Sequence, residues 1–173
     1  AIRDSGFVDT APFIGLAYCG ISWESAFLIT QYHLYVYYND LDLVREMYPF
    51  NLQWMAKVAR LHPEGLVEKG LSDHEALIPS TVTLTGTVHY LQCARIMARF
   101  AHLMNDKTRR VEFTALADGL REKLRQQFWR QPADPATNKQ TLYSALLYFD
   151  VLAEPARQEL EDSLRSAIAG GIA

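Results

Sequence analysis

Four consecutive polar residues, Ser72, Asp73, His74 and Glu75, form the densest group of chemically capable side chains in this sequence. Two carboxyl groups and an imidazole can bind hydroxyl groups or transfer protons when they are suitably placed. Long connections between helices often carry function, because a rigid scaffold can hold their side chains in position. The alternative is a solvated loop with a helix cap, and position alone does not decide between the two.

The polar run lies inside an expected long loop over residues 62–79. Helix-breaking residues occur throughout this loop, namely Pro63, Gly65, Gly70 and Pro79. Proline lacks the N–H group and fixes the backbone angle, so a helix interior is excluded there. Ser80 and Thr81 follow the loop, and their hydroxyl groups can accept bonds from the first free N–H groups of the next helix. We therefore expect a loop that ends at a capped helix.

Composition indicates one soluble globular domain of 173 residues, with 49% hydrophobic and 21% charged residues. The net charge is −3, and acidic and basic residues are interspersed, which argues against a nucleic-acid-binding surface. Aromatic residues make up 12% of the chain. Flat rings beside carboxylates suit sugar binding, and they suit an ordinary core equally well.

Cysteine and histidine usage points to neither a disulfide framework nor a metal centre. One bridge between Cys19 and Cys93 is possible, but both residues lie in apolar surroundings and are more simply interpreted as buried thiols. Because no Cys or His cluster has metal-ligand spacing, we expect no metal and no cofactor. No apolar run approaches the roughly 18 residues that a membrane-spanning helix needs, so we expect no membrane partner.

After an irregular entry segment over residues 1–21, the pattern predicts six helices. Their expected ranges are 23–38, 41–61, 80–104, 107–129, 139–152 and 158–169. Residues 35–38 are rich in Tyr and Val and could also form a strand, although the length of the segment favours a helix. Pro49 predicts a kink or a break inside the second helix.

Apolar and charged helices alternate along the chain, which predicts three helical hairpins. The first helix of each hairpin should be buried by its neighbours, and the second should have one wet face. We therefore expect the segments at 23–38, 81–104 and 139–152 to be more buried than their partners. Two concentric helical layers explain this order, so the predicted fold class is all-α. Three hairpins are about half of an (α/α)6 toroid, and residues 1–173 are read as a partial domain of that kind.

Several segments resemble a known family in order and spacing. They are GFVDTAP at 6–12, ISWESA at 21–26, the stretch from Leu28 to Met55, GLSD at 70–73, and a late segment that runs from Gln140–Thr141 to Leu152–Pro155. Together they resemble the catalytic (α/α)6 barrel of bacterial α-L-rhamnosidases, glycoside hydrolase family 78. Ser25 stands where the family has Asp, with Glu24 beside it, and His74 stands where the family often has Trp.

The resemblance implies an inverting glycoside hydrolase that releases terminal α-L-rhamnose from glycans or glycosides. It places the general acid upstream of Gly6 and the general base on a later helix, so the catalytic residues are not assigned within this chain. The resemblance implies substrate-binding roles for Trp23, Glu24, Asp73 and His74. It also implies two partners, the carbohydrate substrate and the remainder of a parent protein, and a periplasmic or extracellular location.

Each candidate residue also has an ordinary structural interpretation. Trp23 can be a core residue at a helix start, and Glu24 and Asp73 can cap or neutralise a helix end. His74 can be a structural histidine, as we expect for His33, His89 and His102, and Tyr32, Tyr35 and Tyr90 are expected mostly in the core.

Two other functions stay open at this point. One is another (α/α)6 carbohydrate enzyme, such as an unsaturated glycuronyl hydrolase. The other is a non-enzymatic helical-repeat scaffold that binds protein. A scaffold should show an open concave face without a carboxylate cluster, whereas a toroid should gather Trp23, Glu24 and Asp73 at one rim.

Overall fold

The computed structural model describes residues 20–72, 81–131 and 137–170, and these residues form seven helices. The helices are α1 (Ile21–Glu24), α2 (Ala26–Tyr38), α3 (Leu41–Leu61), α4 (Val82–Leu103), α5 (Lys107–Phe128), α6 (Lys139–Tyr148) and α7 (Ala156–Ala169). Within the described ranges there is no β-strand beyond an isolated antiparallel bridge between Gly20 and Gly70. The predicted all-α class is confirmed.

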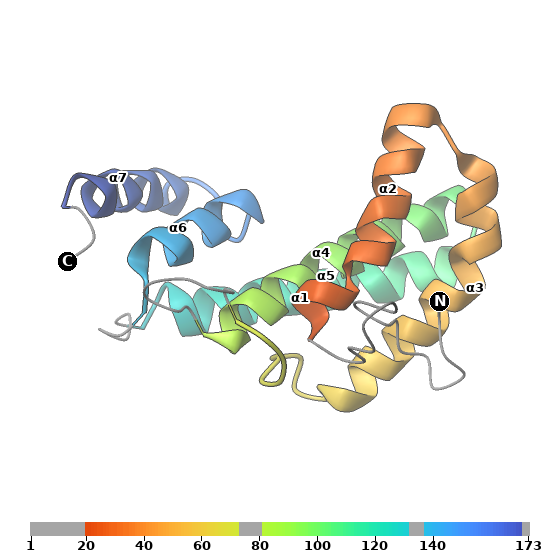
Figure 1. Cartoon of the computed structure of the whole chain (residues 1–173), viewed down its shortest axis with the longest axis horizontal. Helices are drawn as coiled ribbons and strands as arrows, with labels where there is room; N and C mark the ends of the chain where they lie inside the picture. Colours follow the sequence, from red (N-terminus) through yellow and green to blue (C-terminus); the bar gives the residue numbers. More distant parts are fainter. Residues whose placement is uncertain (1–19, 73–80, 132–136, 171–173) are drawn as a thin grey trace, which may run out of the picture.

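The six longer helices form three pairs, α2–α3, α4–α5 and α6–α7, each joined by a short connection. Figure 1 shows the first pair at one end of the molecule and the last pair at the other, with α4 and α5 running between them. Helix α4 contacts α2 and α3 on one side and α6 on the other, so it links all three pairs.

Local capping explains where most helices begin. Side-chain oxygen atoms at four helix starts accept a bond from the backbone N–H three residues later: Asp40 at 3.0 Å, Thr81 at 3.2 Å, Asp106 at 3.0 Å and Asn138 at 3.1 Å. Such bonds satisfy N–H groups that have no partner inside the helix. The cap expected at Thr81 is confirmed.

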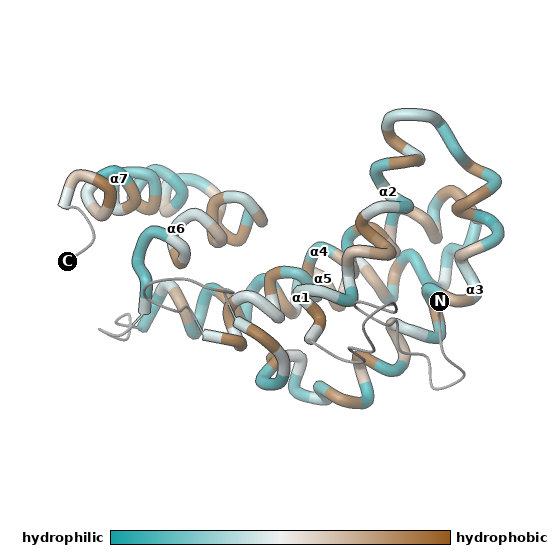
Figure 2. Tube along the Cα trace, in the orientation of Figure 1, coloured by the Kyte–Doolittle hydropathy of each residue, from teal (hydrophilic) through white to brown (hydrophobic). Residues whose placement is uncertain are grey.

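The core is centred on α4. Twelve of its residues are buried, including Leu84, Leu91, Met97 and Phe100, and Figure 2 shows hydrophobic stretches along its length. Cys93 is fully buried in this helix, and burial raises the pKa of its thiol well above the usual value. The expectation of a buried thiol is thus confirmed for Cys93, whereas Cys19 lies outside the described residues.

The structure corrects one local expectation and narrows another. The helix expected over 23–38 is interrupted at Ser25, whose buried side chain lies between α1 and α2. Of the kink or break expected at Pro49, the break is absent, because helix α3 continues from Leu41 to Leu61 with Pro49 inside it. Pro49 lies on the exposed face of α3, where the carbonyl group that loses its helical N–H partner can bind water instead.

The expected order of burial holds for two pairs and is wrong for the first. Helix α4 is more buried than α5, and residues 139–152 are more buried than α7. Over residues 23–38 four residues are buried, Glu24, Ser25, Leu28 and Gln31, which is no larger a share than the six buried residues of α3. Tyr37 and Tyr38 are 74% and 78% exposed. The end of α2 is exposed because, among the described residues, α2 has a neighbour from its own layer, α4, on one side only.

Candidate functional site

The start of α1 and the loop that follows α3 are held together at two glycines. The backbone of Gly20 forms an antiparallel bridge with that of Gly70. The φ angle of Gly20 is 103°, a value that residues other than glycine rarely adopt. A Cβ atom on Gly20 would lie 2.7 Å from the Cα of Gly70. The Ser22 hydroxyl donates a bond of 3.3 Å to the carbonyl oxygen of Leu71. Close backbone approach therefore fixes the loop against α1.

The same loop is fixed to the first half of α4. The Val67 N–H donates to the Thr87 hydroxyl at 3.0 Å, and both residues are fully buried. Val67 also fills the space above Gly86, where an added Cβ would lie 2.4 Å from its side chain. Gly86, which weakens α4 by propensity alone, is thus explained by packing. The loop spans α1 and α4 and lies between the first two helical pairs.

Trp23 and Glu24 lie at this junction and differ sharply in exposure. Trp23 is 39% exposed, whereas Glu24 is 2% exposed. The indole N–H of Trp54 in α3 donates to Oε2 of Glu24 at 3.0 Å, and Phe27 meets Trp54 edge to face. A buried carboxylate needs such partners, since desolvation otherwise disfavours its charge. The structure therefore places Trp23 at the surface, and it buries Glu24 in a hydrogen bond with Trp54 of α3.

The other two candidates, Asp73 and His74, lie outside the described residues, as does Glu75. Of the polar run, only Ser72 is described, and it is partly buried. Leu71, two positions before Asp73, is the residue bonded to Ser22 in α1. The grouping of Trp23, Glu24, Asp73 and His74 around one sugar stays a prediction.

The expectation of a structural role is supported most clearly at His89. Its Nδ1–H donates to the Thr85 carbonyl oxygen at 2.7 Å, and its ring meets Phe149 edge to face. Burial lowers the pKa of His89, although the bond to Thr85 acts in the opposite direction. Sequence reasoning did not single out His62, which is buried and whose pKa is likewise lowered by burial.

Tyr90 is a core residue, as expected, and burial raises its pKa to about 12. Tyr32 and Tyr35 are partly buried and lie beside the guanidinium of Arg99.

A second polar site, which the sequence reasoning missed, is a cavity of about 520 Å³. Its walls include Tyr32, Arg95, Arg99, Tyr148, Phe149 and Asp150. The Arg95 guanidinium donates to the carbonyl oxygens of Phe149 and Asp150 at 2.5 and 3.2 Å. A signal was present in the sequence, since two arginines four residues apart share one face of an otherwise apolar helix.

Within the described ranges, no three His, Cys, Asp or Glu side chains are grouped so that they could hold a metal ion. The helices found there are also too short or too polar to cross a membrane.

Two solved structures share this arrangement of helices. The α-L-rhamnosidase from Dictyoglumus thermophilum matches with a TM-score of 0.86 and 19% identity, over 97% of this chain and 20% of that one. The Streptomyces avermitilis α-L-rhamnosidase, in complex with L-rhamnose, matches with a TM-score of 0.84 and 19% identity, over 98% of this chain and 17% of that one. At such identity the likeness shows the fold. The chain spans about a fifth of the length of these proteins.

The three helical pairs and the two solved structures agree on an all-α fold built from paired helices. More narrowly, residues 3–171 match the model of the bacterial α-L-rhamnosidase six-hairpin glycosidase domain, and the chain belongs to that family. None of the curated protein sequences compared with the chain matches it. The family description gives six hairpins, and the described part of this chain contains three helical pairs.

Proposed function

We propose that this chain is part of the catalytic barrel of a longer glycosidase, called here the parent protein, which releases terminal α-L-rhamnose with inversion. Within the barrel the chain supplies part of the wall of the sugar pocket. The general acid and general base come from other parts of the parent protein. Membership of the six-hairpin family supports the reaction class, and the three helical pairs support the partial barrel.

The observation that carries the proposal is the contrast between Trp23 and Glu24. Trp23, which is 39% exposed as a residue, is held on a backbone that the Gly20–Gly70 bridge and the Ser22–Leu71 bond fix in place. Flat aromatic rings that are exposed and rigidly held suit stacking on the apolar face of a sugar. We propose this stacking role for Trp23.

The remaining roles follow from the position of each residue. Glu24 is bonded to Trp54, and in this proposal it holds the Trp23 segment in place and contributes its charge to the pocket wall. Asp73 and His74, two and three residues beyond Leu71, bind sugar hydroxyl groups.

Inversion needs two carboxyl groups on opposite sides of the anomeric carbon. One protonates the leaving oxygen, and the other activates a water molecule on the far face of the sugar ring. They stand about 6.5–9.5 Å apart in inverting enzymes, so that the water fits between them. In this proposal both groups belong to the remaining hairpins, and Trp23 orients the ring between them.

The test is the substitution Trp23→Ala in the parent protein, assayed with an aryl α-L-rhamnoside. Loss of stacking should lower kcat/KM about three- to tenfold, mostly through KM, because the ring binds substrate and transition state alike. Phe50→Ala is the matched control, since Phe50 is also a partly exposed aromatic residue but lies on α3 in the outer layer. Unchanged kinetics in Trp23→Ala would contradict the stacking role.

Two further readouts address the reaction itself. Proton NMR of the first sugar released should show the β-anomer before mutarotation, and an α-anomer would contradict inversion. Turnover of an unsaturated glycuronide in place of the rhamnoside would identify the alternative enzyme.

A further inference from the structure

The described walls of the cavity of about 520 Å³ belong to one helical layer. They come from α2, α4 and the C-terminal end of α6, which are the first members of the three pairs. No described residue of α3, α5 or α7 contributes to it. The cavity therefore opens on the side of the inner layer, toward the axis of a six-hairpin ring. Neither Trp23 nor Glu24, the described residues of the proposed sugar pocket, contributes to its walls.

Of the two arginines in this cavity, Arg95 is already engaged. Its guanidinium bonds to two carbonyl oxygens at the C-terminal end of α6, where backbone carbonyl groups carry partial negative charge. Arg99 differs, because its Cζ atom lies 5.8 and 5.9 Å from the ring centres of Tyr32 and Tyr35. Among the described residues, no carboxylate lies within ion-pair distance of Arg99, which is exposed. Tyrosine faces orient this cation without neutralising it.

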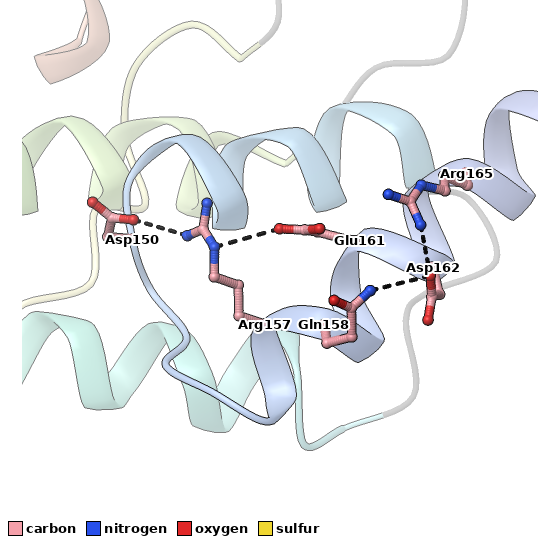
Figure 3. Close-up of polar contacts among 6 residues, drawn as sticks. All are labelled: Asp150, Arg157, Gln158, Glu161, Asp162 and Arg165. Carbon is pink, nitrogen blue, oxygen red and sulfur yellow. Dashed lines mark hydrogen bonds and ion pairs between the residues drawn. The ribbon is translucent and has the colours of Figure 1, made fainter.

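The acidic residue in the cavity wall, Asp150, forms an ion pair with an arginine outside the cavity. Its carboxylate pairs with the Arg157 guanidinium at 2.9 Å, and Arg157 also pairs with Glu161 in α7, as Figure 3 shows. The cavity wall therefore contains two positive charges, Arg95 and Arg99, and one negative charge, Asp150, which is already paired with Arg157. Closing a ring over this wall would bury an excess positive charge, which is strongly unfavourable unless an anion accompanies it.

We propose that Arg99 binds the carboxylate of an Asp or Glu side chain from the remaining hairpins of the parent protein, and that this ion pair joins the two parts of the ring. The occupant is an acidic side chain because the guanidinium fork matches a carboxylate in shape and charge. The two tyrosine rings hold Arg99 in place before the partner arrives. The proposal rests on the proposed function in one respect, namely that the parent protein completes the barrel.

The direct test is zero-length crosslinking of the parent protein that carries Arg99→Lys. A carbodiimide condenses a lysine amine with a carboxyl group in contact, with loss of water, and mass spectrometry of the peptides identifies both ends. We expect a crosslink from position 99 to an Asp or Glu outside residues 1–173. Arg45→Lys is the control, because Arg45 pairs with Asp42 on the exposed face of α3 and should crosslink to that residue.

A second measurement uses the unmodified side chain. An arginine-specific dicarbonyl reagent should label Arg99 of the parent protein at least tenfold more slowly than the exposed Arg45 of the same protein. Labelling of the two residues at the same rate would overturn the proposal, and so would a crosslink only to residues within this chain. Protection without any crosslink would assign the cavity to a small anion and also overturn it. Neither readout depends on rhamnoside turnover. A parent protein without rhamnosidase activity could therefore still show the ion pair, and the two proposals can fail separately.

Discussion

At the scale of single residues, the junction beside Trp23 depends on glycine. Gly20 combines a φ of 103° with a backbone neighbour, Gly70, that leaves no room for a Cβ atom. Residues other than glycine pay of order 1–3 kcal/mol for such a conformation. The close approach that fixes the backbone beside Trp23 is therefore possible only because Gly20 and Gly70 have no side chain.

We expect Gly20→Ala to lower the free energy of unfolding of this chain by about 1–3 kcal/mol, because strain and contact with the Gly70 backbone add. Chemical denaturation at one fixed protein concentration measures this. Ser22→Ala is the control, since it removes only an exposed hydrogen bond at the same junction and should cost less than about 1 kcal/mol. Equal effects of the two substitutions would show that the close approach is unimportant.

His89 makes stability depend on pH. Burial holds its pKa in the folded chain below the ordinary histidine value of 6.5. The neutral form is therefore favoured by folding, and this contribution is fully present above pH 6.5 and is lost as the pH falls toward the folded pKa. One such group changes the free energy of unfolding by at most about 1.4 kcal/mol per pH unit.

His89→Gln should therefore flatten the fall in stability below pH 6.5. Denaturation of both proteins at several pH values on either side of this point measures the slope. Parallel slopes in the two proteins would exclude His89 as a source of the dependence.

At the scale of elements, Gly86 shows how α4 holds the loop. Alanine in a helix interior is normally about 1 kcal/mol more favourable than glycine. At Gly86, however, a Cβ atom would lie 2.4 Å from Val67 Cγ1 and 2.8 Å from its Cβ. Packing between the helix and the loop should outweigh propensity here.

Gly86→Ala should destabilise the chain by about 1–3 kcal/mol, and adding Val67→Ala should recover part of that loss, so that the two effects are not additive. Gly119→Ala in α5 is the control, since nothing lies within 4 Å of its added Cβ, and it should stabilise the chain. The interpretation fails if Gly86→Ala stabilises the chain as Gly119→Ala does.

Helix positions and several caps were predictable because they depend on local chemistry. Asp40, Thr81 and Asp106 accept bonds from N–H groups three residues away, and sequence spacing is enough to recognise them. The interruption at Ser25 was not predictable, because it arises where α1 packs against α4 and the loop from α3 meets it. The exposure of α2 was missed because apolar composition does not tell which neighbours are present.

The candidate site was predictable only in part. Trp23 and Glu24 were selected by resemblance, but their opposite exposures depend on Trp54, thirty positions later. The arginine cavity depends on three helices far apart in the sequence, and a pattern within one helix shows only the pair Arg95 and Arg99.

At the scale of the whole molecule, large apolar and aromatic side chains are exposed at the ends of two helices of the inner layer. Val36, Tyr37 and Tyr38 at the end of α2 are strongly exposed, as is Tyr148 at the end of α6. Contiguous apolar surface of more than a few hundred Å² is rare on stable monomers. We expect this chain by itself to pair or aggregate, and the parent protein to be soluble.

The central claim is that these three helical pairs form a pocket wall whose acid and base lie elsewhere in the parent protein. The measurement is release of the aryl group from an aryl α-L-rhamnoside by the purified parent protein and by this chain alone, beside a mass from light scattering. General acid–base assistance contributes about a hundredfold to ten-thousandfold per group, so the account predicts turnover by the parent protein and none by the chain. Clear turnover by the monomeric chain would contradict it, and would mean that Glu24, Asp73 or Glu75 carries out the chemistry.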